Sequence, residues 1–220
     1  MALTLYLHPL SSFCHKALIA LYENDIAFTP VVVNLGDKDS SEAFKKVWPV
    51  GRFPVLKDGE RIVPESTCII EYLALHYPGK TILIPDDAKR AFDVREWDRF
   101  FDLNLHLHMQ KVIGDRIRPE GERDPHGVAH AKRMIETGLA LAEKQIAGKN
   151  WIAGDDFTMA DCAAAPPLFY CDFAVEKLAG RYDKLTAYLE RLKQRPSYAR
   201  ALKEAEPFMQ WVPQDKQTTT

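Results

Sequence analysis

Two serines and a cysteine near the start of the chain have the types and spacing to stabilise an anion. Ser11, Ser12 and Cys14 follow a short apolar run at residues 3–7 and a break at residues 8–10. The pattern after them is helical, so we expect these side chains at the start of a helix. Serine is a preferred N-cap, and a helix N-terminus presents free N–H groups and a partial positive charge.

A second set of candidate residues surrounds the dipeptide Phe53-Pro54. Proline lacks an N–H and belongs at a strand start, an edge strand or a cis bend. An apolar run at 55–56, a turn at 57–59 and a second run at 61–63 predict a β-hairpin. With a cis bond, residue 53 would hold its N–H and C=O outward, where a peptide-like ligand can pair with them. The alternative is an ordinary trans turn, since only about one X-Pro bond in twenty is cis. The place of Phe53-Pro54 at a strand start, between Arg52 and the hairpin, leads us to predict the cis bond.

The elements that must position these residues follow from hydrophobic periodicity. Strands are predicted at 3–7 and 28–33, and the hairpin adds two more. One helix follows Ser12, a second ends near Val47, and a third runs from about residue 65 to residue 77. The predicted order is therefore β-α-β-α-β-β-α.

Three segments that contain these candidate residues resemble segments of a known protein family. The segments Ser11-Ser-Phe-Cys-His-Lys16, Gly51-Arg-Phe-Pro54 and Glu65-Ser66 resemble the thioredoxin-like domain of the cytosolic glutathione S-transferases, of the serine type found in bacteria. The remainder resembles the family's all-helical domain. The resemblance implies an α/β thioredoxin-like N-terminal domain (βαβαββα), followed by an all-α C-terminal domain. We expect domains at residues 1–79 and 86–212, with a flexible tail at 213–220.

Composition agrees with this resemblance and excludes other classes. The 220 residues include 46% hydrophobic residues, and the formal net charge of −2 argues against general binding to nucleic acid or anionic membranes. No apolar stretch approaches the roughly twenty residues of a membrane span, and the first residues lack a signal pattern. Four cysteines without a C-x-x-C pair favour free thiols in a reducing cytosol. We therefore expect a cytoplasmic protein.

The pattern of apolar residues predicts helices in the second half of the sequence. Apolar residues recur at helical spacing over 94–113 and 128–146, with a polar loop expected at 114–127. Thr158-Met-Ala-Asp161 matches a capping box before an apolar run. Asp161 is accordingly interpreted as a buried helix cap, in preference to a catalytic carboxylate.

The resemblance implies a specific chemistry for the helix start. The family binds glutathione, ionises its thiol and offers the thiolate to an electrophile. A free thiol has a pKa of about 8.5 and is only slightly ionised at neutral pH. Ser11 matches the position of the family's catalytic serine, whose hydroxyl donates to sulfur. Ser12, Cys14 and Tyr6 on the first strand remain the alternatives for this role. The structural interpretation of Ser12 is an N-cap, and that of Cys14 is a packing residue.

The resemblance also implies how the rest of glutathione is held. Glu65 would meet the ammonium of the γ-glutamyl end, and Ser66 would hold its carboxylate at a helix N-terminus. The Phe53-Pro54 segment would offer backbone atoms to the cysteinyl unit. Arg52 would bind the glycyl carboxylate.

A second pocket, for a small hydrophobic electrophile, is expected between the two domains. Its candidate residues are Leu10, Phe13, Asn104 and His108. His106 is a further polar position on this helix, and its ring and that of His108 should point apart, so no metal site is expected there. His126 and His130 have a better spacing, but they begin in a polar loop without a nearby third ligand, and we interpret them as surface histidines. The family resemblance further implies a homodimer.

Three classes of function remain open at this point. The first, which we favour, is a glutathione S-transferase acting on hydrophobic electrophiles. The second is a glutathione-dependent peroxidase, reductase or isomerase on the same scaffold, although a serine at position 11 argues against disulfide exchange. Isomerase relatives of the maleylacetoacetate type carry Ser-Ser-Cys where this chain has Ser11-Ser12-Phe13. The third is a non-catalytic binding module.

Overall fold

The N-terminal region folds around a mixed four-stranded sheet. The computed structural model describes residues 3–214. Its strands are β1 (Leu3–Leu7), β2 (Phe28–Val32), β3 (Val55–Asp58) and β4 (Arg61–Pro64), in the spatial order β2-β1-β3-β4. The pair β1–β2 is parallel, whereas β1–β3 and β3–β4 are antiparallel. The predicted hairpin is thus present as β3 and β4.

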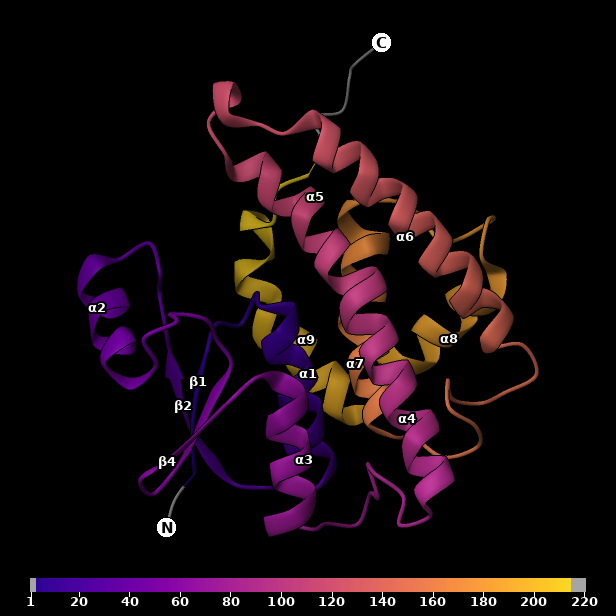
Figure 1. Ribbon diagram of the computed structural model, residues 1–220, viewed down its shortest axis with the longest axis horizontal. Helices are drawn as coiled ribbons and strands as arrows, with labels where there is room; N and C mark the ends of the chain where they lie inside the picture. The colour runs from indigo at the N-terminus through magenta and orange to yellow at the C-terminus, as the bar shows by residue number, and fades with distance from the viewer. Residues whose placement is uncertain (1–2, 215–220) are drawn as a thin grey trace.

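Helices cover both faces of this sheet, because side chains alternate along each strand. Leu3, Leu5 and Leu7 are buried toward the main core, while Tyr6 packs on the opposite face against Phe44. Phe44 comes from α2 (Lys38–Val47). The helices α1 (Ser12–Glu23) and α3 (Ser66–His76) lie together on the other side of the sheet (Figure 1). The predicted βαβαββα order is confirmed.

A long helix opens the second region and forms one wall of the interface between the two domains. It comprises α4 (Ala88–Phe101), a π-helical turn at Asp102–His106, and α5 (Leu107–Ile117). The predicted loop at 114–127 is therefore too long, because the helix continues through Gly114 to bury Asp115. The link between α3 and α4 contains neither helix nor strand over residues 78–87.

The remaining helices pack behind this wall. They are α6 (Pro125–Gln145), α7 (Met159–Ala174), α8 (Asp183–Gln194) and α9 (Pro196–Ala205), with short 3₁₀ turns at Glu120–Glu122 and Glu206–Trp211. Helix α1 packs against α7 and α9, so it is buried between the sheet and the helical domain (Figure 1). Most of the predicted tail, residues 215–220, lies outside the described residues.

Asp161 is a buried structural cap, as predicted. It is fully buried, and its carboxylate accepts hydrogen bonds from the Thr158 N–H at 2.8 Å, the Ile152 N–H at 3.0 Å and the Tyr188 hydroxyl at 2.5 Å. These bonds join the start of α7 to the preceding loop and to α8.

Among the described residues, no helix is both long and apolar enough to cross a membrane.

Candidate active site

Ser11 is the N-cap of α1. Its Oγ accepts a hydrogen bond from the Cys14 N–H at 3.3 Å, and its own N–H donates to the His8 carbonyl at 2.9 Å. Its φ of −74° and ψ of 115° are extended, as expected for an N-cap. Because the cap bond uses a lone pair of the oxygen, the hydroxyl hydrogen can donate to a ligand.

A cavity of about 420 Å³, here called the strand-side cavity, opens beside Ser11. The structure brings together around it the residues predicted to be catalytic or to bind glutathione, namely Ser11, Arg52, Phe53, Pro54, Glu65 and Ser66. Phe13 and Gln110 also line it. The Phe53–Pro54 bond is cis, as predicted.

Glu65 has an unusual backbone conformation at the edge of this cavity. Its φ is +66°, which is uncommon for a residue other than glycine. It precedes α3 as the N-cap, yet its side chain makes no capping hydrogen bond. The carboxylate is therefore available to a ligand, while Ser66, the first helical residue, is buried at the helix N-terminus. Such backbone outliers cluster at ligand-binding sites.

A second cavity of about 440 Å³, the helix-side cavity, adjoins the first. Ser11, Phe53 and Gln110 line both cavities, so the two spaces meet at the start of α1. Most other lining residues are apolar or aromatic, including Leu10, Met109, Ile113, Tyr170, Trp211 and Val212. The Tyr170 hydroxyl donates to the Leu10 carbonyl at 2.9 Å and so ties the wall from α7 to the loop before α1.

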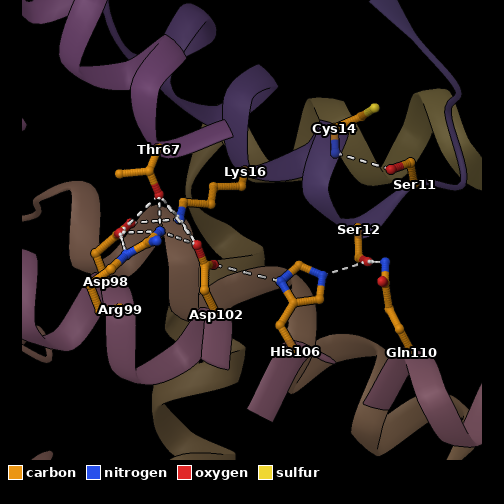
Figure 2. Close-up of polar contacts among 10 residues, drawn as sticks. All are labelled: Ser11, Ser12, Cys14, Lys16, Thr67, Asp98, Arg99, Asp102, His106 and Gln110. Carbon is orange, nitrogen blue, oxygen red and sulfur yellow. Dashed lines mark hydrogen bonds and ion pairs between the residues drawn. The ribbon is translucent and has the colours of Figure 1, made fainter. Parts of the chain in front are cut away.

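Ser12 is not an N-cap, contrary to the sequence-based alternative. It is the first residue of α1, and its Oγ lies 2.6 Å from His106 Nε2 and 3.5 Å from Gln110 Nε2 (Figure 2). His106 is fully buried. Its ring stacks on Phe13, with 3.6 Å between centroids. Burial, helped by the nearby Lys16 cation, lowers the pKa of His106 well below its usual value.

Beyond His106 lies a buried charge cluster that is not predicted from the sequence. Lys16, fully buried on α1, pairs with Asp98 at 2.6 Å and with Asp102 at 2.8 Å. Arg99 pairs with both carboxylates from the outer side, and the Thr67 hydroxyl bridges the group (Figure 2). Two cations thus balance two carboxylates, as buried charges require.

The sequence carried one signal for this cluster. Asp98, Asp102, His106 and Gln110 recur every four residues, which places them on one helix face. A polar stripe within a segment that also has an apolar face indicates a buried polar contact. The partner residues on α1 and α3 are far away in sequence, so spacing alone could not identify them.

The other candidates occupy different surroundings. Cys14 is fully buried, and burial raises the pKa of its thiol to about 12, which disfavours a thiolate at neutral pH. Leu10 lines the helix-side cavity and Phe13 the strand-side cavity. Asn104 and His108 line neither of these two cavities; the His108 ring lies 6.0 Å from that of His130 on α6. Tyr6 packs against Phe44, 5.8 Å between ring centroids.

The remaining groups that could react or bind a metal are the cysteines and clusters of His, Cys, Asp and Glu side chains. All four cysteines are free; Cys14, Cys162 and Cys171 are buried, whereas Cys68 is exposed on α3. Within residues 3–214, no group of three or more His, Cys, Asp and Glu side chains is arranged to hold a metal ion.

Sequence comparisons place both halves of the chain in one family. The family model for the glutathione S-transferase N-terminal domain matches residues 5–81, and that for the C-terminal domain matches residues 125–191. Glutathione S-transferase A of Pleuronectes platessa is 31% identical over 193 residues, covering 84% of each chain. Glutathione S-transferase Z2 of Arabidopsis thaliana is 29% identical over 213 residues, covering 93% of this chain and 92% of its own.

Solved structures of glutathione S-transferases have the same fold as this chain. A glutathione S-transferase from Methylobacterium radiotolerans, in complex with glutathione sulfonate, aligns with a TM-score of 0.82 and 26% sequence identity. The alignment covers 100% of this chain and 99% of the other. Its extent and the two matching domain models confirm a thioredoxin-like domain followed by an all-helical one. The chain belongs to the glutathione S-transferase family.

Proposed function

We propose that this protein conjugates glutathione to small hydrophobic electrophiles and that Ser11 stabilises the glutathione thiolate. The observation that carries the proposal is the meeting of two cavities at Ser11. One cavity is lined by the charged and polar residues that suit a tripeptide, and the other is largely apolar. A sulfur at their junction would face both Ser11 and the second substrate.

The ionisation of the thiol follows from the position of Ser11. Its hydroxyl can donate to sulfur, and the N-terminus of α1 supplies a favourable field for an anion. Both effects stabilise the thiolate relative to the thiol and so lower the pKa of the bound glutathione. No general base is required for this step, because the thiol then ionises to solvent near neutral pH.

The charges of the strand-side cavity match the two ends of glutathione. The Glu65 carboxylate, unused by the helix cap, is suited to the γ-glutamyl ammonium. The buried N-terminus of α3 at Ser66 is suited to the adjacent carboxylate. Arg52 also lines this cavity, and its guanidinium suits the glycyl carboxylate. Support also comes from the related Methylobacterium radiotolerans structure, which holds glutathione sulfonate.

An isomerase that uses glutathione as a catalyst is the second candidate. Relatives of the zeta class support it, since one from Euphorbia esula is 27% identical over 212 residues. Phe13 stands at the position where isomerases of the maleylacetoacetate type carry the cysteine of Ser-Ser-Cys. The transferase is favoured because Phe13 leaves that motif incomplete.

One set of assays separates the candidate functions. The protein should be retained on glutathione-agarose and eluted by free glutathione. The eluted protein should then be assayed with an aryl halide, an organic hydroperoxide and maleylacetoacetate. Turnover of the aryl halide supports the transferase, turnover of maleylacetoacetate alone supports the isomerase, and retention without any turnover supports a binding module.

We further propose a homodimer in the cytoplasm. Support comes from large apolar side chains that are exposed to solvent: Leu75 on α3 is 78% exposed, and Phe92 on α4 is 65% exposed. Leu103, in the π-helical turn that continues α4, is also exposed. A second copy would remove these side chains from water.

A further inference from the structure

Ser12, His106 and Asp102 form a line of side chains that the proposed conjugation does not use. Ser12 Oγ lies 2.6 Å from His106 Nε2, and His106 Nδ1 lies 3.9 Å from Asp102 Oδ1 (Figure 2). The first distance is that of a hydrogen bond. The second is longer than a hydrogen bond, but contacts between a base and its orienting group are often loose in ligand-free sites.

The unpaired atoms of this line face each other. Among the described residues, His106 Nδ1 and Asp102 Oδ1 are both buried and lack a hydrogen-bond partner. The other oxygen of Asp102, Oδ2, is occupied by Lys16 at 2.8 Å and by Arg99 at 2.6 Å. Asp102 therefore has one oxygen left for the imidazole. A small approach of the two atoms would satisfy both, with the Nδ1–H donating to the carboxylate.

This arrangement determines the direction of the hydrogen bond at Ser12. The low pKa of His106 keeps its imidazole neutral, because the ring is fully buried and the Lys16 cation and His15 lie nearby. With the Nδ1 proton directed to Asp102, Nε2 carries a lone pair and accepts the Ser12 hydroxyl. A serine held in this way has its proton acceptor in place and its oxygen lone pairs free.

Ser12 Oγ also borders a space that can hold a substrate. Ser12 is among the residues that line the helix-side cavity of about 440 Å³, although only 5% of the residue is exposed. Gln110 Nε2, 3.5 Å from Oγ, is a donor at the same point. The N–H groups of Ser12 and Phe13 lie in the first turn of α1, where a helix has no internal acceptor for them. These groups are suited to a carbonyl oxygen that gains negative charge.

From this geometry we propose that Ser12 is the nucleophile of a second activity: hydrolysis of small, apolar carboxylic esters through an acyl-Ser12 intermediate, without glutathione. His106 acts as the base and Asp102 orients it. A purely structural contact between α1 and the π-helical turn would require neither the contact of Ser12 with a cavity nor the pair of unpartnered atoms behind His106. The π-helical turn that carries Asp102 and His106 is a feature often found at functional sites.

The reaction balances with water as the co-reactant. Ser12 Oγ forms a bond to the acyl carbon while its proton moves to His106 Nε2. The bond from the acyl carbon to the leaving oxygen then breaks, and that oxygen takes the proton and departs as an alcohol or phenol. Water attacks the acyl-Ser12 ester, gives one proton to His106, and releases the carboxylic acid as the Ser12 oxygen recovers a proton.

The decisive experiment is covalent labelling of the wild-type protein in the absence of glutathione. The purified protein is incubated with an alkyl fluorophosphonate, digested, and sequenced by mass spectrometry. We expect a single phosphonylated residue, Ser12, and steady hydrolysis of p-nitrophenyl butyrate that the label abolishes. An unlabelled protein, or a label on Ser11 or elsewhere, would overturn the proposal.

A histidine pair on one helix supplies the matched control. His106→Asn should lower the rate of labelling at Ser12 at least about a hundredfold, the usual contribution of a positioned base. His108→Asn should label at the wild-type rate, since that ring faces His130. Retention on glutathione-agarose and the melting temperature verify the fold of each variant. A folded His106→Asn protein that labels as fast as wild type would contradict the role of His106. Should that variant not fold, the wild-type labelling site decides.

Discussion

Ser11 and Ser12 are adjacent in sequence, but their hydroxyls have different partners. Ser11 Oγ accepts the N–H of Cys14 within α1, whereas Ser12 Oγ lies against His106 from the long helix of the second domain. Ser11 also lines both cavities, while Ser12 lines the helix-side cavity of the two. The hydrogen of Ser11 is therefore the one that remains free for a sulfur at the junction.

Glutathione affinity should depend on Glu65. Glu65→Ala removes the carboxylate that is proposed to meet the γ-glutamyl ammonium, so the apparent KM for glutathione should rise at least about tenfold. Glu60→Ala, which removes an exposed carboxylate from the hairpin turn, is the matched control and should leave KM unchanged. Steady-state kinetics at saturating electrophile measure both. An unaltered KM in Glu65→Ala would remove this residue from the site.

The buried charge cluster should govern stability. Lys16→Met leaves two carboxylates with Arg99 as their remaining cationic partner, and the free energy of unfolding should fall by about 3–5 kcal/mol. Lys177→Met, which breaks the exposed pair with Asp172, should cost less than about 1 kcal/mol. Urea unfolding at neutral pH compares the two. Equal small effects would show that the cluster contributes little.

How far the sequence predicts the structure depends on whether a signal is local. The Phe53-Pro54 bend, the Thr158–Asp161 cap and the strand alternation depend on neighbouring residues, and each was predictable. The Ser12–His106 contact joins residues 94 positions apart, and the Lys16–Asp102 pair joins residues 86 apart. No local propensity encodes such pairings, so neither contact could be predicted from the sequence.

The same reasoning explains an error at the end of α5. The sequence predicts that a loop begins at Gly114, because glycine has a low helix propensity. In the folded protein, Val112 and Asp115 are buried, and this packing sustains the helix through Gly114. Tertiary burial therefore overrides the local preference at this position.

Stability should decline in acid because buried histidines resist protonation. Burial lowers the pKa of His15 to about 4, below its ordinary value of 6.5. Between these values the unfolded chain binds more protons than the folded one. The free energy of unfolding therefore rises with pH over this range, and it decreases as the pH falls from 6.5 toward about 4. For His15 alone the loss is on the order of 3 kcal/mol.

Urea unfolding at a series of pH values checks this dependence. A His15→Gln variant should show a shallower decline over the same range, whatever its absolute stability. His126→Gln removes an exposed histidine and should decline as wild type does. Parallel curves for wild type and His15→Gln would exclude His15 as a source of acid sensitivity.

Association should depend on the apolar surface near α4. Analytical ultracentrifugation at micromolar concentration should give twice the 25.0 kDa mass of one chain. Phe92→Asp should shift the protein toward the single-chain mass, because it places a charge among apolar side chains. Leu141→Asp, at an exposed position on α6, should not. A single-chain mass for the wild-type protein would refute the homodimer.

The pKa of bound glutathione tests most directly whether Ser11 stabilises the thiolate. Ultraviolet titration of the enzyme–glutathione complex should give a thiol pKa that rises by about one to two units in Ser11→Ala, the effect of losing a hydrogen bond to an anion. Ser11→Thr, which keeps a hydroxyl and a helix cap, should stay near wild type. Turnover of an aryl halide at neutral pH should fall about ten- to hundredfold in Ser11→Ala, with glutathione affinity little changed. An unchanged thiol pKa in Ser11→Ala, together with a raised one in Ser12→Ala or Cys14→Ala, would contradict the assignment.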